Sequence, residues 1–416
     1  MAKKRPLRPN SQINEKTTQC PKNLLKEGVP TVAGTLKLLE ILCPQLGKWL
    51  SLNLAILTAA LLQLWQGARS GQGHLTLCAL SRAMPLLTPE KVRSKRLYRL
   101  LRNRALEGSQ MTPLLVRLAL GEKPKGFVPI VIDQTDIRGT PTLLAGILVA
   151  HRVLPVAFAC FRYETLYKSQ NRLESALLKL VAASLPPGCK PLYVMDRGYA
   201  RVSLLKELSL LRIPYLIRGR SHTIVRSAGQ RLSLGRLPHA KGRAIRYSDV
   251  AYHDQQQEHL DVLIFHDPDF KEPWYLLVPP HSQALLPDEA IVALYRQRMH
   301  IELTFRDWKT HLGIRGLSLQ VDIAPRLERL IFGLTLAYIL ALLIGAGKSA
   351  PLVRRHCEVL RCTPRHGTRR RLSALSVGIL LLSLPQFRSL ARSALRALLK
   401  DLRHGVPSLI LATHPP

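Results

Sequence analysis

The sequence predicts an α/β protein with a mixed sheet, preceded and followed along the chain by helical regions. Between residues 121 and 220, short apolar runs alternate with stretches of helical periodicity, as in a sheet covered by helices. Residues 31–120 and 348–416 are rich in Leu, Ala and Arg, so we expect helices there. Residues 221–285 contain short strand-like runs between turn-forming residues, which indicates a β-rich insertion.

The elements expected in the central region follow in order. Three neighbouring strand-like runs, which indicate an antiparallel meander, cover residues 127–133, 142–152 and 153–163. A helix, a strand, a second helix and a further strand are then expected over 171–185, 190–196, 201–211 and 213–220. Asn171 is the expected N-cap of the first of these helices. The insertion should contain strands at 222–227, 230–234, 259–265 and 274–279.

The charge of the chain points to a polyanionic partner. Lys and Arg total 61 against 27 Asp and Glu, a formal net charge of +34. This excess is larger than solubility requires, and it favours nucleic acid over an anionic membrane surface. The seven cysteines show no disulfide framework, which fits a reducing cytoplasm. Cys357 and Cys362 have an unusual spacing for zinc, so we interpret them as ordinary thiols.

Two apolar stretches have the composition of membrane spans. Residues 330–347 carry no charge and reach the minimum length of a span, and residues 49–65 are similar but include polar residues. A buried core helix is the favoured interpretation of both stretches, and a membrane anchor through 330–347 is the alternative. Residues 1–16 are basic and polar, without the apolar region of a secretory signal.

Residues 89–104 predict a strongly basic helix. Seven cations stand against one Glu, and Pro89 is at the expected first helical position after the cap Thr88. A charge run is usually a solvated face. The size of this excess instead favours contact with DNA phosphates, for which the candidates are Lys95, Arg96 and Arg99.

The segment 288–313 contains no Gly or Pro before its last residue, so it predicts one helix. At about 100° per residue, four polar side chains fall within about 60° of one another: Tyr295, Arg298, Glu302 and Lys309. An apolar stripe lies beside this row: Leu294, Ile301, Phe305, Trp308 and Leu312. The opposite face is expected to meet solvent: Arg296, Gln297, His300, Thr304 and Asp307. A carboxylate beside cations and a phenol suits a site for phosphates and a metal, whereas a solvated ion-pair row is the alternative.

Two further carboxylates, Asp133 and Asp196, end predicted strands. Functional residues gather at the carboxyl ends of strands in open α/β sheets, although a lone Asp there often only forms a turn. Together with Glu302 they predict a cluster of three carboxylates, the ligands that Mg²⁺ prefers. Two such ions, about 3.5–4 Å apart, can activate an attacking oxygen and stabilise the leaving one. Asp136 competes with Asp133 but is expected past the strand end.

These motifs carry a family resemblance. They are Asp133-Gln-Thr, Asp196-Arg-Gly-Tyr, and Tyr295, Arg298, Glu302 and Lys309 with two, three and six residues between them. In this order and spacing, over roughly residues 90–345, the chain resembles the DDE transposases of bacterial insertion sequences that carry the Y-R-E-K signature. The resemblance implies an RNase H-like mixed sheet flanked by helices, with a β-rich insertion between the second Asp and the Glu. It also implies two Mg²⁺ (or Mn²⁺) ions on Asp133, Asp196 and Glu302, with Tyr295, Arg298 and Lys309 gripping phosphates at the transposon end.

Three other residues gain a candidate role from the resemblance. Trp274 stands 21 residues before Tyr295, where some family members use a Trp to hold a base flipped out of the duplex. A core Trp in a strand is an equally good interpretation. Arg218 and Arg220 resemble a basic strand end that approaches DNA in relatives, and an exposed turn is the alternative.

The resemblance implies cut-and-paste transposition by a cytoplasmic, nucleoid-associated enzyme that binds double-stranded DNA, forms a homodimer in the synaptic complex and does not enter a membrane. The alternatives are an RNase H-like nuclease that cuts without joining, and a catalytically inactive DNA-binding derivative. We expect a disordered basic arm over 1–30 and a helical DNA-binding region over 31–120. The catalytic core should cover 121–220 and 286–347, with the β-rich insertion at 221–285 between its two parts. An Arg-rich helical region is expected over 348–416.

Overall fold

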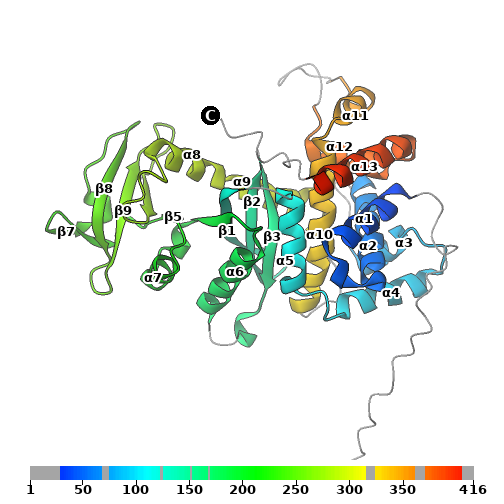
Figure 1. Ribbon diagram of the computed structural model, residues 1–416, viewed down its shortest axis with the longest axis horizontal. Coiled ribbons are helices and arrows are strands. Elements are labelled where there is room, and N and C mark those ends of the chain that lie inside the picture. The colour runs from blue at the N-terminus through cyan, green and yellow to red at the C-terminus, as the bar shows by residue number, and fades with distance from the viewer. Residues whose placement is uncertain are drawn as a thin grey trace, which may run out of the picture.

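The computed structural model describes residues 29–67, 75–121, 125–149, 152–166, 169–314, 324–360 and 371–404. The molecule is elongated, with a sheet at one end and a bundle of helices at the other (Figure 1). The expected basic arm falls, except for its last two residues, outside the described residues. Both halves of the bundle come from the ends of the chain, which confirms the helical terminal regions.

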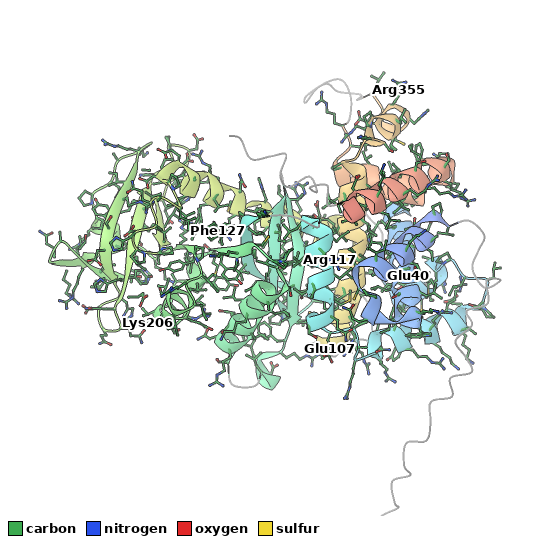
Figure 2. The ribbon with its side chains drawn as sticks, in the orientation of Figure 1. Glu40, Glu107, Arg117, Phe127, Lys206 and Arg355 are labelled. Atoms are coloured by element: carbon green, nitrogen blue, oxygen red, sulfur yellow. The ribbon has the colours of Figure 1, made fainter. Side chains whose placement is uncertain are left out.

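Five helices precede the sheet: α1 (Pro30–Leu42), α2 (Lys48–Gly67), α3 (Leu77–Ala83), α4 (Glu90–Arg102) and α5 (Gly108–Leu120). Pro89 holds the N-cap position of α4 instead of the first helical position that was expected. α5 packs on the sheet and carries Arg117 at the junction with the bundle (Figure 2). Its guanidinium donates to the carbonyl of Leu42, 3.3 Å away, which ties the end of α1 to this junction.

The sheet begins with the expected antiparallel meander of β1 (Gly126–Ile137), β2 (Thr140–Val149) and β3 (Arg152–Cys160). Next come α6 (Gln170–Ser184), β4 (Cys189–Met195), α7 (Val202–Leu210) and β5 (Tyr215–Arg218). β4 pairs in parallel with β1, and β5 pairs in parallel with β4. The resulting order, β3-β2-β1-β4-β5, confirms the RNase H-like mixed sheet. The N-cap of α6 is Ser169, so the assignment of Asn171 was wrong by two residues.

The β-rich region forms no separate sheet. Its five strands are β6 (Ile224–Ser227), β7 (Gln230–Ser233), β8 (Ala244–Tyr252), β9 (Glu258–Phe265) and β10 (Trp274–Val278). β10 pairs antiparallel with β5, so all ten described strands form one sheet. The sequence prediction missed β8, because a bulge between Tyr247 and Val250 breaks its alternation.

The single helix expected over 288–313 is divided. α8 (Asp288–Arg298) ends at Met299, α9 (His300–Arg306) follows, and a π-helical turn covers Asp307–His311. Met299 keeps right-handed helical angles, so the chain continues in a helical path through the division. Tyr295 and Arg298 therefore lie on α8, Glu302 on α9 and Lys309 in the π turn.

The predicted solvent face of this segment was wrong at two positions. Thr304 is fully buried, and its hydroxyl donates to the carbonyl of Val153 on β3, 2.9 Å away. Asp307 is also buried, forms an ion pair of 3.0 Å with Arg152 and accepts a hydrogen bond from the hydroxyl of Tyr338. Both residues are covered because α9 packs on β3, which helical periodicity alone does not show.

The chain closes with α10 (Ala324–Gly345), α11 (Ala350–Cys357), α12 (Ala374–Ser383) and α13 (Arg388–His404). α10 lies between β3 on one side and α2 and α12 on the other, so it is the core helix that was favoured for residues 330–347. Lys48–Gln66 and Ala324–Gly345 have the length and composition of membrane spans, but 78% and 83% of their apolar windows are buried within the protein.

α10 and α12 cross with their backbones in contact. A Cβ atom on Gly378 would lie 1.8 Å from the carbonyl oxygen of Ala341, and one on Gly345 would lie 1.9 Å from that of Ala374. Neither position can hold a larger residue unless the backbone of the facing helix shifts, so this crossing requires glycine on both helices.

We expect Gly378→Ala to lower the free energy of unfolding by about 3 kcal/mol or more, because the overpacked atom meets backbone and not a movable side chain. Helix propensity alone would give the opposite sign, since Ala is favoured over Gly in a helix by about 1 kcal/mol. Urea unfolding measures the difference. Gly198→Ala is the control, because its Cβ would meet no atom within 4 Å. Equal stability of the two variants would contradict the close crossing.

Candidate active site

The register of two parallel strands brings the first two predicted carboxylates together. Ile132 of β1 pairs with Met195 of β4, and Asp133 and Asp196 are the residues that follow this pair along the chain. Asp196 directly follows β4, as expected. Asp133 does not end its strand, because β1 continues for four residues paired with β2. Asp133 directly follows the last residue of β1 that pairs with β4, so no β4 residue is paired beside it.

Asp136 is not past the strand end, as had been expected, but within β1. Its side-chain oxygen accepts a hydrogen bond from the backbone N–H of Gly139, 2.7 Å away, in the turn between β1 and β2. This carboxylate therefore stabilises a turn, and the structure places it apart from the contact between Asp133 and Arg298.

Arg298 connects the two acidic strands to α8. One terminal nitrogen donates to the carboxylate of Asp133 at 3.0 Å, and the other lies 4.0 Å from a carboxylate oxygen of Asp196. The Arg298 side chain is 7% exposed, against 18% for Asp133 and 36% for Asp196. A buried guanidinium thus faces two carboxylates from neighbouring strands, and the pair with Asp133 is the more deeply buried.

Tyr295 lies one helical turn before Arg298, with the guanidinium carbon 5.7 Å from the centre of its ring. The Tyr295 hydroxyl and the Arg298 Nε are both buried, and within the described part of the chain neither donates a hydrogen bond to an acceptor. Burial raises the pKa of Tyr295, with the charge of Arg298 opposing, so the hydroxyl keeps its proton. Two buried donors without acceptors are suited to an anionic oxygen, such as that of a phosphate.

Glu302 completes the acidic group. It is exposed on α9, and its charge reaches Asp133. Burial raises the pKa of Asp133; Arg298 and the N–H of Gln134 oppose this rise, and the charges of Glu302 and Asp196 add to it. The charges of Glu302 and Asp196 therefore both act on Asp133. Lys309 is half-buried in the π turn, with its ammonium 5.9 Å from the ring centre of Phe305.

The acidic group fits a divalent cation by its chemistry, since carboxylate oxygens are the donors that Mg²⁺ and Mn²⁺ prefer. Within the described ranges, no three His, Cys, Asp or Glu side chains are arranged as metal ligands. The guanidinium of Arg298 already faces Asp133 and Asp196 as their cation. The same carboxylates could bind a metal once Arg298 moves away from Asp133.

A cleft of about 600 Å³ opens beside Asp196, and its lining includes Arg218 and Arg220. Arg218 lies 3.6 Å from Glu272, and Arg220 donates to the carbonyl of Arg197 at 3.4 Å. Sequence reasoning missed two further basic residues that line the same cleft, Arg197 and His222. Their positions in the sequence could have indicated this, since Arg197 directly follows Asp196 and His222 lies two residues after Arg220.

Trp274 is a core residue of β10. It is 6% exposed, and its ring meets that of Tyr295 edge-on with the centres 5.1 Å apart. Phe265 and Phe270 also contact the indole. This packing favours the core interpretation, because stacking on a flipped-out base would require the indole or its neighbours to move.

The candidates on α4 lie away from the carboxylates. α4 packs on α2, α3 and α10 in the helical bundle, not on the sheet (Figure 1). Lys95 and Arg99 are exposed, whereas Arg96 turns toward α2 and donates to the side-chain oxygen of Asn53. Lys95 and Arg99 are therefore available to a partner in solution, and Arg96 joins two helices.

A buried layer that sequence reasoning missed supports Asp133 from behind. Glu174 on α6 is 4% exposed and forms an ion pair with Arg201. Gln170, one turn earlier, donates to Glu174 at 2.9 Å and to Gln134 at 2.7 Å. Since the N–H of Gln134 donates to Asp133 at 2.8 Å, this network fixes the strand at that carboxylate. No local sequence pattern indicates this network, because its residues come from three separate elements.

The chain was compared with known proteins. A family model described as the transposase DDE domain matches residues 127–340 of the 416, which is more than half of the chain. No curated protein matches the chain. Among solved structures, the cryo-EM structure of the piggyBac transposase synaptic complex with hairpin DNA is 11% identical, with a TM-score of 0.43, over 94% of this chain and 87% of that one. The matched span contains all three carboxylates and the row on α8, α9 and the π turn, and the chain belongs to the transposase DDE domain family.

Proposed function

We propose that the protein cleaves DNA at the ends of a transposon and joins the freed 3′ ends to target DNA in cut-and-paste transposition. The observation that supports this most strongly is the contact of one buried Arg298 with Asp133 and Asp196, with Glu302 close behind. Two strand carboxylates that face one guanidinium, with the charge of a third carboxylate acting on Asp133, suit phosphodiester chemistry inside a transposase DDE domain.

In this proposal Asp133, Asp196 and Glu302 hold two divalent cations, Mg²⁺ or Mn²⁺. When bound, the ions supply charge neutralisation at the scissile phosphate and activation of the attacking oxygen. Arg298 leaves Asp133 for a DNA phosphate, so its positive charge stays compensated in both states. The protonated Tyr295 hydroxyl donates to the same phosphate region, where its orphaned proton gains an acceptor.

The DNA partner is double-stranded and approaches from the side of the acidic group. Lys309 contacts phosphates beyond Arg298 on the same helical path. Arg218 and Arg220 contact the strand that enters the cleft beside Asp196. A homodimer holds the two transposon ends in one synaptic complex, at the nucleoid in the bacterial cytoplasm.

Two other activities use the same domain. A nuclease would cut the end without joining it, and a strand-transfer assay with a labelled end and target plasmid separates the two. An inactive DNA-binding derivative would bind the end without cutting. The retention of all three carboxylates, with Asp133 in a buried ion pair, favours the active enzyme over that derivative.

We expect Asp133→Ala, Asp196→Ala and Glu302→Ala each to reduce Mg²⁺-dependent cleavage to background, because each removes a metal ligand. The assay uses a labelled duplex that carries the inverted repeat flanking the gene. Binding of the same duplex should be largely retained, since the phosphate contacts come from other residues.

Asp136→Ala is the matched control for these variants. Its carboxylate lies on the same strand as Asp133 but serves only the turn at Gly139, so cleavage should continue at close to the wild-type rate. Full cleavage by any of the three carboxylate variants would remove that residue from the proposed metal site.

We expect Arg298→Ala and Lys309→Ala each to weaken binding of the transposon end and to reduce the slope of log affinity against log salt by about 0.9, the effect of one phosphate contact. Fluorescence anisotropy across a NaCl series measures both quantities. Arg296→Ala is the control, because that guanidinium is bound by Asp267 at 2.6 Å and points away from the row. An unchanged slope for Arg298→Ala would argue against its phosphate contact.

A further inference from the structure

Four cations of the last described helix, α13, form a row that the proposed function does not use. Arg388, Arg392, Arg396 and Lys400 recur every four residues, and all four are exposed. At about 1.5 Å rise per residue, this basic row extends along about 18 Å of the helix surface, turning by about 40° at each step. A duplex presents a phosphate every 3.4 Å or so along each strand, so a stretch of this length offers about five phosphates per strand.

In the described part of the chain, none of the four forms an ion pair with a carboxylate, and Arg396 donates only to the carbonyl of Arg392. Asp401 is the one acid on α13, and it lies about 100° round the helix from Lys400. The neighbouring α1 exposes one charge of each sign, Lys37 and Glu40.

The face of α13 beside the basic row is fixed in the protein core. Four small or apolar residues at helical spacing are buried there: Ala391, Leu395, Leu399 and Leu402. They pack on α1 and α12, and the contact is close, since a Cβ on Gly34 would lie 2.7 Å from Leu395. A basic amphipathic helix that binds membranes inserts its apolar face into the lipid. Because this apolar face is already covered, α13 can offer a partner only its charges, which favours a charged polymer over a bilayer.

We propose that the basic row on α13 binds the phosphate backbone of double-stranded DNA without reading its sequence. α13 lies in the helical bundle, on the other side of α10 from the sheet, so this DNA segment is separate from the one at the carboxylates (Figure 1). Arg355 of α11, at the same end of the molecule, is also exposed (Figure 2). This surface goes beyond the proposed cleavage activity and does not depend on it.

The test replaces the four cations by Gln in the full-length chain: Arg388→Gln, Arg392→Gln, Arg396→Gln and Lys400→Gln. Binding of a random-sequence duplex is followed by fluorescence anisotropy across a NaCl series. Four phosphate contacts predict a fall in salt slope of about 3 to 4, at about 0.9 each, and a loss of affinity of tenfold or more at low salt. Circular dichroism and the melting temperature check that the variant folds.

A matched control removes the same charge elsewhere. Arg82, Lys179, Arg226 and Arg231 are equally exposed but each lies within an ion pair with Glu90, Glu207 or Asp254. Their replacement by Gln should change the salt slope by less than about 1. A cation that is already paired with a carboxylate neutralises DNA phosphates weakly, so it releases few counterions from the duplex. Equal losses in the two variants would show that only total charge matters and would overturn the proposal, as would an unchanged slope in the α13 variant.

Two further measurements separate the remaining outcomes. Keeping the charge, with Arg388→Lys, Arg392→Lys and Arg396→Lys, should restore most of the duplex affinity, which a merely structural role of the arginines would not do. Flotation with phosphatidylserine vesicles tests the membrane alternative. If the Gln variant lost vesicle binding but kept duplex binding, the partner would be an anionic lipid surface.

Discussion

The buried ion pair between Arg298 and Asp133 holds the site together. It joins residues 165 positions apart and docks α8 onto the middle of the sheet. Breaking a buried pair by removing one partner costs about 3–5 kcal/mol, because the remaining charge is left without compensation. Docking at this point sets Tyr295 one turn before the guanidinium and Glu302 one turn after it. The same contact keeps the two strand carboxylates facing a cation, so the acidic group can exist without mutual repulsion.

Under the proposed mechanism, this contact would also let one site serve a resting and an active state. Arg298 compensates Asp133 and approaches Asp196 in the structure, while its Nε and the Tyr295 hydroxyl lack acceptors. A phosphate would supply those acceptors, and divalent cations would replace the guanidinium at the carboxylates. In the proposed exchange, cations would compensate the carboxylates and a phosphate would compensate Arg298, so the sheet would need little reorganisation. Arg298 is the residue that would move in this exchange, when DNA and metal arrive.

Much of the fold and the site could be predicted from local patterns. Apolar runs located β1 to β5, and rotation of about 100° per residue put Tyr295, Arg298 and Glu302 on one face. What failed depended on distant partners. β1 runs past Asp133 because β2 pairs with it, and Asp307 is buried because Arg152 and Tyr338 bind it. The Arg298 pair itself has no local signal, since helix periodicity describes a face but not what the face meets. The same limit applies to the basic row of α13, whose exposure follows from packing on α1 and α12.

The central claim is that Asp133 and Asp196 exchange Arg298 for divalent cations when DNA arrives. Crystals of the complete chain with a transposon-end duplex and Mn²⁺ would test it directly, through anomalous scattering from the metal. The account expects an anomalous peak at about 2.1–2.2 Å from carboxylate oxygens of Asp133 and Asp196, as for small octahedral cations. Arg298 should then contact a phosphate. A bound duplex with the Arg298–Asp133 pair intact and manganese located elsewhere would contradict the account.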